Sequence, residues 1–211
     1  MDLRARRGLI GSNARFPSAY QEVEYIESTG TQWLSARFNP RANDVITLDM
    51  AYTTNNTSSV GISYLGNNKN PYNYSRVLVG VRDGYFVTFI GYSFGCKSDV
   101  PIDTARHKFV FDIGSFTTTI DDNVALVEPT KDFRYQTYAY YVLFATIRNE
   151  RDVLCASCRV YNLKVAEGNT ITHDLIPCYR KADGEIGMYD RVTRIFIANS
   201  GTGTFLKGAD V

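Results

Sequence analysis

The chain has little of what marks nucleic-acid-binding and membrane-spanning proteins. Its 23 basic and 22 acidic residues leave a net charge of +1, so no field of one sign attracts nucleic acid or a lipid surface. It contains no run of about 18 apolar residues, the length that a membrane-spanning helix needs. It also has no glycine-rich phosphate loop and no basic stripe interleaved with aromatic residues. We therefore expect neither nucleic acid nor membrane insertion.

Cysteine is too sparse for an evident metal or redox centre. Cys155 and Cys158 form a CxxC pair, but Cys96 and Cys178 are isolated and supply no second close pair for a zinc site. The CxxC pair lies in an alternating, strand-like run, where residues three apart point to opposite faces. We therefore expect buried or half-buried free thiols that pack as small hydrophobic side chains.

The two histidines offer no evident catalytic chemistry either. Neither His107 nor His173 has a serine or cysteine together with an aspartate placed as a catalytic triad requires. We expect both at the surface or at strand ends.

Aromatic residues are abundant and proline is rare, which favours strands. The chain has 15 Tyr and 12 Phe against 6 Pro. Its 211 residues suit one all-β domain, a class that runs to roughly 200–250 residues without splitting. Asp-Gly pairs at 83–84 and 183–184 predict hairpins of type I′, in which both central residues have positive φ. The polar triplet 121–123 predicts a third reversal.

The apolar pattern predicts about a dozen short strands and no helix. Residues 45–52 alternate cleanly between the two faces of a half-buried strand. Residues 20–28 predict the first strand, and residues 175–205 predict a meander of three strands. Such a meander has one apolar face that a second layer must cover. We therefore expect two packed antiparallel sheets.

Two stretches near the ends carry a family resemblance. The opening run, residues 17–32, reads PSAYQEVEYIESTGTQ, and the closing run, residues 176–205, reads IPCYRKADGEIGMYDRVTRIFIANSGTGTF. Both resemble the signatures of the laminin G-like (concanavalin A-like) jelly-roll domains of bacteriophage structural proteins and gut-bacterial surface proteins. The resemblance implies a two-sheet antiparallel jelly-roll sandwich over residues 16–211, with the first and last strands side by side. It specifies a fold more than a function, because such folds host many activities.

Residues 1–15 are expected to form a flexible basic arm. Glycines give the arm freedom, and a disordered tail is the simplest interpretation. The alternative is an anchor that becomes ordered against another virion protein, through Arg4, Arg6, Arg7, Leu9 and Ile10.

A loop rich in Asn and Tyr is the predicted ligand site. Sugars stack on aromatic faces and hydrogen-bond to amides, and loops often carry function. The candidate residues are Asn70, Tyr72, Asn73 and Tyr74. A second aromatic cluster contains Tyr135, Tyr138, Tyr140 and Tyr141. The alternatives are ordinary loop and strand packing, or a contact with another subunit.

Paired acidic residues suggest two further chemistries. Asp121 and Asp122 are candidate calcium ligands, since laminin G-like domains often bind calcium at a rim, although aspartate is also common in turns. Glu22, Glu24 and Glu27 have the spacing of the Glu-x-Asp-x-x-Glu strand of concanavalin A-like glycosidases. Here, however, the middle residue is Glu, and the motif lies in the first predicted strand rather than in mid-chain. We expect no catalysis and no required cofactor, with calcium as an alternative.

Together these features predict a non-enzymatic bacteriophage virion protein. Its jelly-roll domain would decorate the capsid, a head fibre or the tail, or adhere to host-surface glycans. The absence of a secretion signal after Met1 favours assembly in the host cytoplasm. The alternatives are an extracellular carbohydrate-binding module of a gut bacterium and a glycosidase. A monomer and a homo-oligomer are both compatible with the sequence.

Overall fold

The computed structural model describes residues 16–39, 41–54, 62–63, 76–91, 96–127, 140–149 and 152–211. Within these ranges every regular element is a β-strand, and all paired strands are antiparallel. The strands are β1 Tyr20–Glu22, β2 Ile26–Thr29, β3 Leu34–Ser35, β4 Asp44–Tyr52, β5 Ile62–Ser63, β6 Arg76–Arg82, β7 Tyr85–Gly91, β8 Cys96–Pro101, β9 His107–Asp112, β10 Thr117–Ile120, β11 Val124–Val127, β12 Val142–Leu143, β13 Ala145–Asn149, β14 Asp152–Cys155, β15 Ser157–Glu167, β16 Thr170–Arg180, β17 Ile186–Asp190, β18 Ile195–Ala198 and β19 Leu206–Lys207. The all-β prediction is confirmed.

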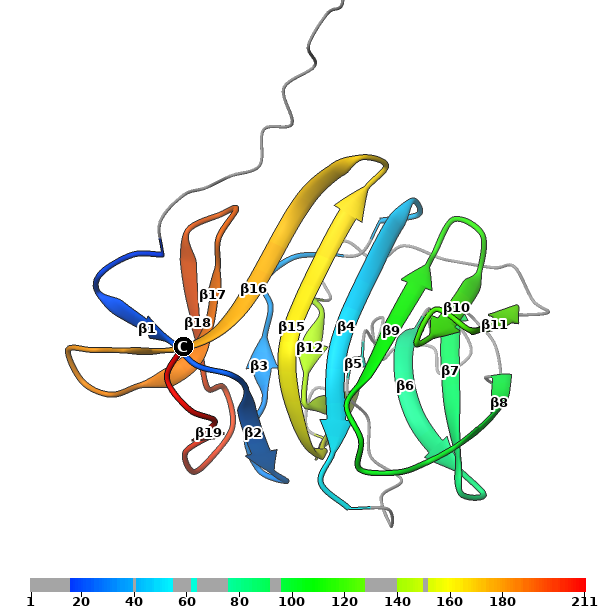
Figure 1. Ribbon diagram of the computed structural model, residues 1–211, viewed down its shortest axis with the longest axis horizontal. Coiled ribbons are helices and arrows are strands. Elements are labelled where there is room, and N and C mark those ends of the chain that lie inside the picture. The colour runs from blue at the N-terminus through cyan, green and yellow to red at the C-terminus, as the bar shows by residue number, and fades with distance from the viewer. Residues whose placement is uncertain are drawn as a thin grey trace, which may run out of the picture.

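One large sheet dominates the molecule. Its 11 strands include the continuous order β11-β10-β9-β4-β15-β16-β17-β18. β1 pairs with the end of β16, and β2 pairs with β15 and β19. Three smaller sheets have the orders β3-β12-β5, β6-β7-β8 and β13-β14. Figure 1 shows β3, β12, β5, β6 and β7 behind one face of the large sheet.

The main hydrophobic cluster joins the large sheet to the β3-β12-β5 and β6-β7-β8 sheets. Ile46 and Leu48 of β4 belong to the same buried cluster as Val79 of β6, Phe86 of β7 and Leu143 of β12. In β4 the buried Ile46, Leu48 and Met50 alternate with partly exposed residues, as the sequence pattern predicts. β6 and β7 are buried on both faces, and Leu78, Val87 and Phe89 form a second buried cluster. This burial holds the layers together, since apolar surface removed from water stabilises by about 25 cal/mol per Å².

The predicted first strand is in fact two strands. β1 ends at Glu22, and β2 begins at Ile26. The chain changes partner between them, because β1 pairs with β16 whereas β2 pairs with β15. The single strand predicted over residues 20–28 was therefore wrong, since alternation in sequence does not reveal a change of partner.

The two Asp-Gly pairs form different turns. Asp83 and Gly84 have φ of 53° and 78° and join the paired residues Arg82 and Tyr85, as a two-residue hairpin requires. At 183–184 only Gly184 has positive φ, and the Gly184 amide donates to the Arg180 carbonyl at 2.8 Å across a longer loop. The second type I′ prediction was wrong, because the strand pairing ends at residues 179 and 186, too far apart for a two-residue turn.

The opening and closing runs lie against each other. β2 pairs with β19, and the Thr202 amide donates to the Thr31 carbonyl at 3.1 Å. A Cβ at Gly201 would collide with the backbone oxygen of Thr31, so glycine is required at this close approach. The first strand, β1, pairs with β16, so the first and last parts of the chain meet through β2 and β19 rather than through the first strand itself.

Candidate functional site

Most predicted ligand and anchor residues lie outside the described ranges. These are Asn70, Tyr72, Asn73 and Tyr74 of the loop, Tyr135 and Tyr138, and Arg4, Arg6, Arg7, Leu9 and Ile10 of the arm. Two members of the second aromatic cluster are described. Tyr141 is buried in the core, whereas Tyr140 is 48% exposed. Tyr141 is therefore a packing residue, and the glycan and anchor hypotheses for the other residues stay predictions.

The candidate calcium residues have protein partners. Asp121 accepts the Lys108 amide at 2.8 Å and lies 2.6 Å from Nδ1 of His107. Asp122 pairs with the Lys108 ammonium at 2.9 Å. Both aspartates have positive φ in the turn between β10 and β11, so the alternative explanation, turn chemistry, accounts for them. No group of three or more His, Cys, Asp or Glu side chains in the described ranges is arranged to hold a metal ion.

The glutamate motif does not form a two-carboxylate site on one strand. Glu22 ends β1, Glu24 lies in the bend between strands, and Glu27 belongs to β2. Glu27 pairs with Nε of Arg159 at 2.6 Å, and that guanidinium lies over the Tyr25 ring at 4.8 Å. The glycosidase alternative therefore has no support from this geometry.

The thiols are free, as expected. Cys158 and Cys178 are buried, and Cys96 and Cys155 are partly exposed. Burial raises the pKa of Cys178 to about 12 and raises that of Cys158 further, so both are poor nucleophiles and poor metal ligands.

The histidines are less exposed than predicted. His107 does begin β9, but it is 9% exposed and makes two carboxylate contacts. His173 lies inside β16, with its side chain 20% exposed, and its ring stacks on Phe38 at 3.8 Å. The strand-end prediction is confirmed for His107 and wrong for His173. Both side chains are largely buried, because Asp103, Asp121 and Asp190 supply the partners that burial requires.

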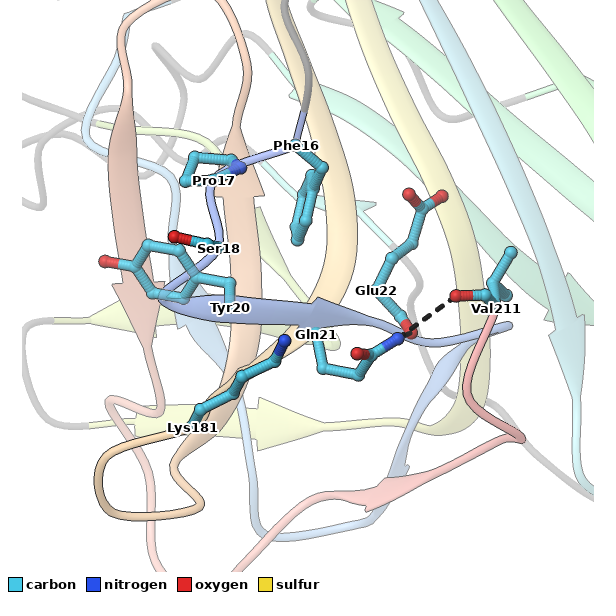
Figure 2. Close-up of a pocket in the computed structure, with 8 residues that line it drawn as sticks. All are labelled: Phe16, Pro17, Ser18, Tyr20, Gln21, Glu22, Lys181 and Val211. Carbon is cyan, nitrogen blue, oxygen red and sulfur yellow. Dashed lines mark hydrogen bonds between the residues drawn. The ribbon is translucent and has the colours of Figure 1, made fainter.

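A cleft of about 720 Å³ lies beside β1 (Figure 2). We call it the β1 cleft. It is lined by Phe16, Pro17, Ser18, Tyr20, Gln21, Glu22, Lys181 and Val211. Three segments distant in sequence form it: the entry to β1, the turn after β16 and the end of the described chain. It therefore exists only because β1 pairs with the end of β16 and the Lys181 amide donates to the Ala19 carbonyl at 2.9 Å.

Aromatic rings form one side of the β1 cleft. Tyr20 stacks on Phe196 with centroids 5.2 Å apart and contacts Tyr189 at 5.0 Å. Phe16 meets Tyr189 edge-on at 5.6 Å. Tyr189 is only 6% exposed, whereas Phe16 and Tyr20 are half-buried and keep part of their surface accessible. The accessible rings of Phe16 and Tyr20 are thus packed against the buried Tyr189.

Polar groups line the remainder of the β1 cleft. The Gln21 side-chain amide donates to the Val211 carbonyl at 3.1 Å, which Figure 2 marks. The Val211 amide in turn donates to the Glu22 carbonyl at 3.1 Å. The Lys181 side chain is exposed, and Figure 2 shows it extending toward Gln21. Fixed aromatic surface beside donors and acceptors is typical of a small-molecule site.

Sequence reasoning missed the β1 cleft, although part of the signal was present. Tyr20 lies in the opening run, and Lys181 lies in the closing run. In the opening run, Tyr20, Gln21 and Glu22 belong to a predicted strand rather than to a loop. The closing run supplies Lys181 to the lining but no aromatic residue. Only the pairing of Tyr20 with Arg180 brings them together.

No family model matches the chain, and no curated protein is significantly similar to it. The described part of the chain also contains no helix long and apolar enough to cross a membrane.

Proposed function

We propose that this protein is a non-enzymatic bacteriophage virion component whose jelly-roll domain binds host-surface glycans. The observation that carries the proposal is the β1 cleft, with accessible aromatic surface at Phe16 and Tyr20 next to the polar Gln21, Glu22 and Lys181. Pyranose rings place their C–H faces on aromatic rings and their hydroxyls on amides, carboxylates and ammonium groups. The antiparallel two-layer arrangement supports the jelly-roll assignment, and the two signature runs support the virion assignment.

Glycan binding is tested with the full-length protein on intact host cells. We expect saturable binding that soluble capsular polysaccharide competes away. Lys181→Ala removes an exposed side chain of the cleft, and we expect it to weaken binding about five- to tenfold, the loss expected from one or two hydrogen bonds. Lys97→Ala, on β8 in a different sheet, is the matched control and should bind like the wild type.

Three further variants distinguish binding at the β1 cleft from binding at the predicted loop. Tyr72→Ala and Tyr74→Ala test the loop, and Phe16→Ala tests the aromatic wall of the cleft. Loss of binding in the loop variants alone would move the site away from the β1 cleft. Unchanged binding in all of these variants, or no binding by the wild type, would refute glycan adhesion through either site.

The virion assignment has its own test. Mass spectrometry of purified particles should detect this chain in stoichiometric amounts. Its absence from the particles would contradict the assignment and favour an extracellular module of a bacterium.

A further inference from the structure

A second, smaller cleft lies at the edge of the large sheet where β4 begins. It has a volume of about 320 Å³ and is lined by Phe38, Asn39, Arg41, Asp44, Thr172 and His173. We call it the Asp44 cleft. Phe38, Asn39 and Arg41 precede β4 in the chain, and Thr172 and His173 come from β16. The volume is at the lower end of that of small-ligand sites.

Asp44 is the unusual residue of this cleft. It is 2% exposed, and its Oδ2 accepts the Arg41 backbone amide at 2.8 Å. Its Oδ1 is buried and has no hydrogen-bond partner within the described ranges. Buried carboxylates are normally paired or fully hydrogen-bonded, because burying an isolated charge is costly. The pKa of Asp44 is raised by burial, although the amide and the guanidinium of Arg41 act in the opposite direction.

The nearby cation is already engaged. The Arg41 guanidinium pairs with Glu167 at 2.7 Å, and both side chains are largely exposed. Among the described ion pairs none includes Asp44. The cleft therefore contains a buried negative charge with no counter-charge in direct contact.

His173 lines the cleft beside Asp44 and has a carboxylate partner of its own. Its Nδ1 lies 2.7 Å from Oδ2 of Asp190, a carboxylate whose pKa is lowered to about 2, because its hydrogen bonds outweigh its burial. His173 is therefore already engaged by Asp190, whereas Oδ1 of Asp44 still requires a donor.

We propose that the Asp44 cleft binds a small ligand that carries a protonated primary amine, with the ammonium group paired to Asp44. An ammonium group has three donors and no acceptor, and its positive charge compensates the buried carboxylate. A hydroxyl or a water molecule could donate a hydrogen bond but would leave the negative charge uncompensated. A calcium ion fits less well, because it takes six to eight oxygen ligands and Asp44 is the cleft's one carboxylate. This inference is independent of glycan binding at the β1 cleft.

The probes are cyclohexylamine and its neutral isostere cyclohexanol. Binding is followed by NMR titration, in the full-length protein, of the backbone amides of Phe38, Asn39, Arg41, Asp44, Thr172 and His173. We expect saturable shifts of these amides with cyclohexylamine and affinity at least about tenfold weaker for cyclohexanol, which corresponds to about 1.4 kcal/mol. This comparison needs no variant. Equal affinity for the two probes, or no saturable shift with the amine, would overturn the proposal.

Asp44→Asn removes the charge and retains an oxygen for the Arg41 amide. We expect this variant to lose at least about tenfold in affinity for cyclohexylamine. We also expect it to unfold at a temperature no lower than the wild type, because the substitution relieves a buried charge. Asp83→Asn, in the exposed turn between β6 and β7, is the matched control and should leave amine binding unchanged. Amine binding by Asp44→Asn at wild-type affinity would refute the role of the carboxylate.

Discussion

Two histidine-containing regions of the molecule differ in how completely their carboxylates are hydrogen-bonded. In the β9–β10 corner, His107 lies between Asp103 and Asp121, at 2.8 and 2.6 Å. In the β4–β16 corner, His173 satisfies Asp190, yet Asp44 in the same corner has one oxygen without a partner. The comparison shows that acidic residues indicate a ligand site only where the fold has not already supplied their cations and donors.

The largest expected effect on stability is at Asp190, the buried carboxylate that pairs with His173 in the β4–β16 corner. Asp190 accepts from the backbone amides of Asp174 and Val192, the Thr193 hydroxyl and His173. We expect Asp190→Ala to lower the free energy of unfolding by about 3 kcal/mol or more, because several buried donors lose their acceptor. Urea denaturation measures this loss.

The control for this prediction is a surface carboxylate. Asp183→Ala removes an exposed ion pair to Arg180, and we expect a much smaller loss than for Asp190→Ala, because exposed ion pairs contribute little. Equal losses in the two variants would contradict the assigned importance of Asp190.

Acid should weaken the same corner by a smaller amount. The pKa of Asp190 falls from its usual 3.8 to about 2, because its hydrogen bonds outweigh its burial. A depressed pKa stabilises the folded state above pH 4, and that contribution, about 2 kcal/mol, is lost as the pH falls toward 2. The stability difference between wild type and Asp190→Asn should therefore shrink over this range in denaturation curves. A constant difference would show that Asp190 does not titrate there.

The β9–β10 corner should respond in the opposite direction. Burial lowers the pKa of His107, but the hydrogen bonds to Asp121 and Asp103 raise it to a value above 6.5 overall. The stabilisation is therefore complete below pH 6.5 and is lost as the pH rises through the folded-state pKa. We expect His107→Gln to cost about 1–2 kcal/mol at pH 6 and less at pH 9. Urea denaturation at both pH values tests this, and the same loss at each would contradict a charged His107.

The smallest effect is expected at the surface of the β9–β10 corner. Asp122 is 70% exposed and pairs with Lys108. We expect Asp122→Asn to change stability by no more than about 0.5 kcal/mol and calcium to leave the melting temperature of the wild type unchanged. A calcium-dependent rise that Asp122→Asn abolishes would restore the calcium hypothesis.

Local patterns predicted the strands well, because a half-buried strand needs alternation whatever its partners are. Residues 45–52 illustrate this, since β4 covers nearly the same range. Patterns predicted less well where partners change, as between Glu22 and Ile26, or where turn geometry depends on register, as at Gly184. Register and partner are long-range properties that no short window contains.

The candidate sites were largely beyond sequence reasoning. The β1 cleft unites Tyr20 with Lys181, and the Asp44 cleft unites Asp44 with His173. Neither pair forms a recognised spacing, because each consists of residues more than one hundred positions apart. The glutamate motif failed for the complementary reason, since its three residues are close in sequence but do not share one strand.

The sequence by itself determined that this protein is all-β and that its strands are antiparallel. Alternating apolar residues and turn residues are sufficient for that. Only the tertiary structure decided which charged groups are neutralised, with Asp121 held by His107 and Asp44 left with a free oxygen. The physical reason is that the energy of a buried charge depends on the neighbours that folding brings within a few ångströms, not on its neighbours along the chain.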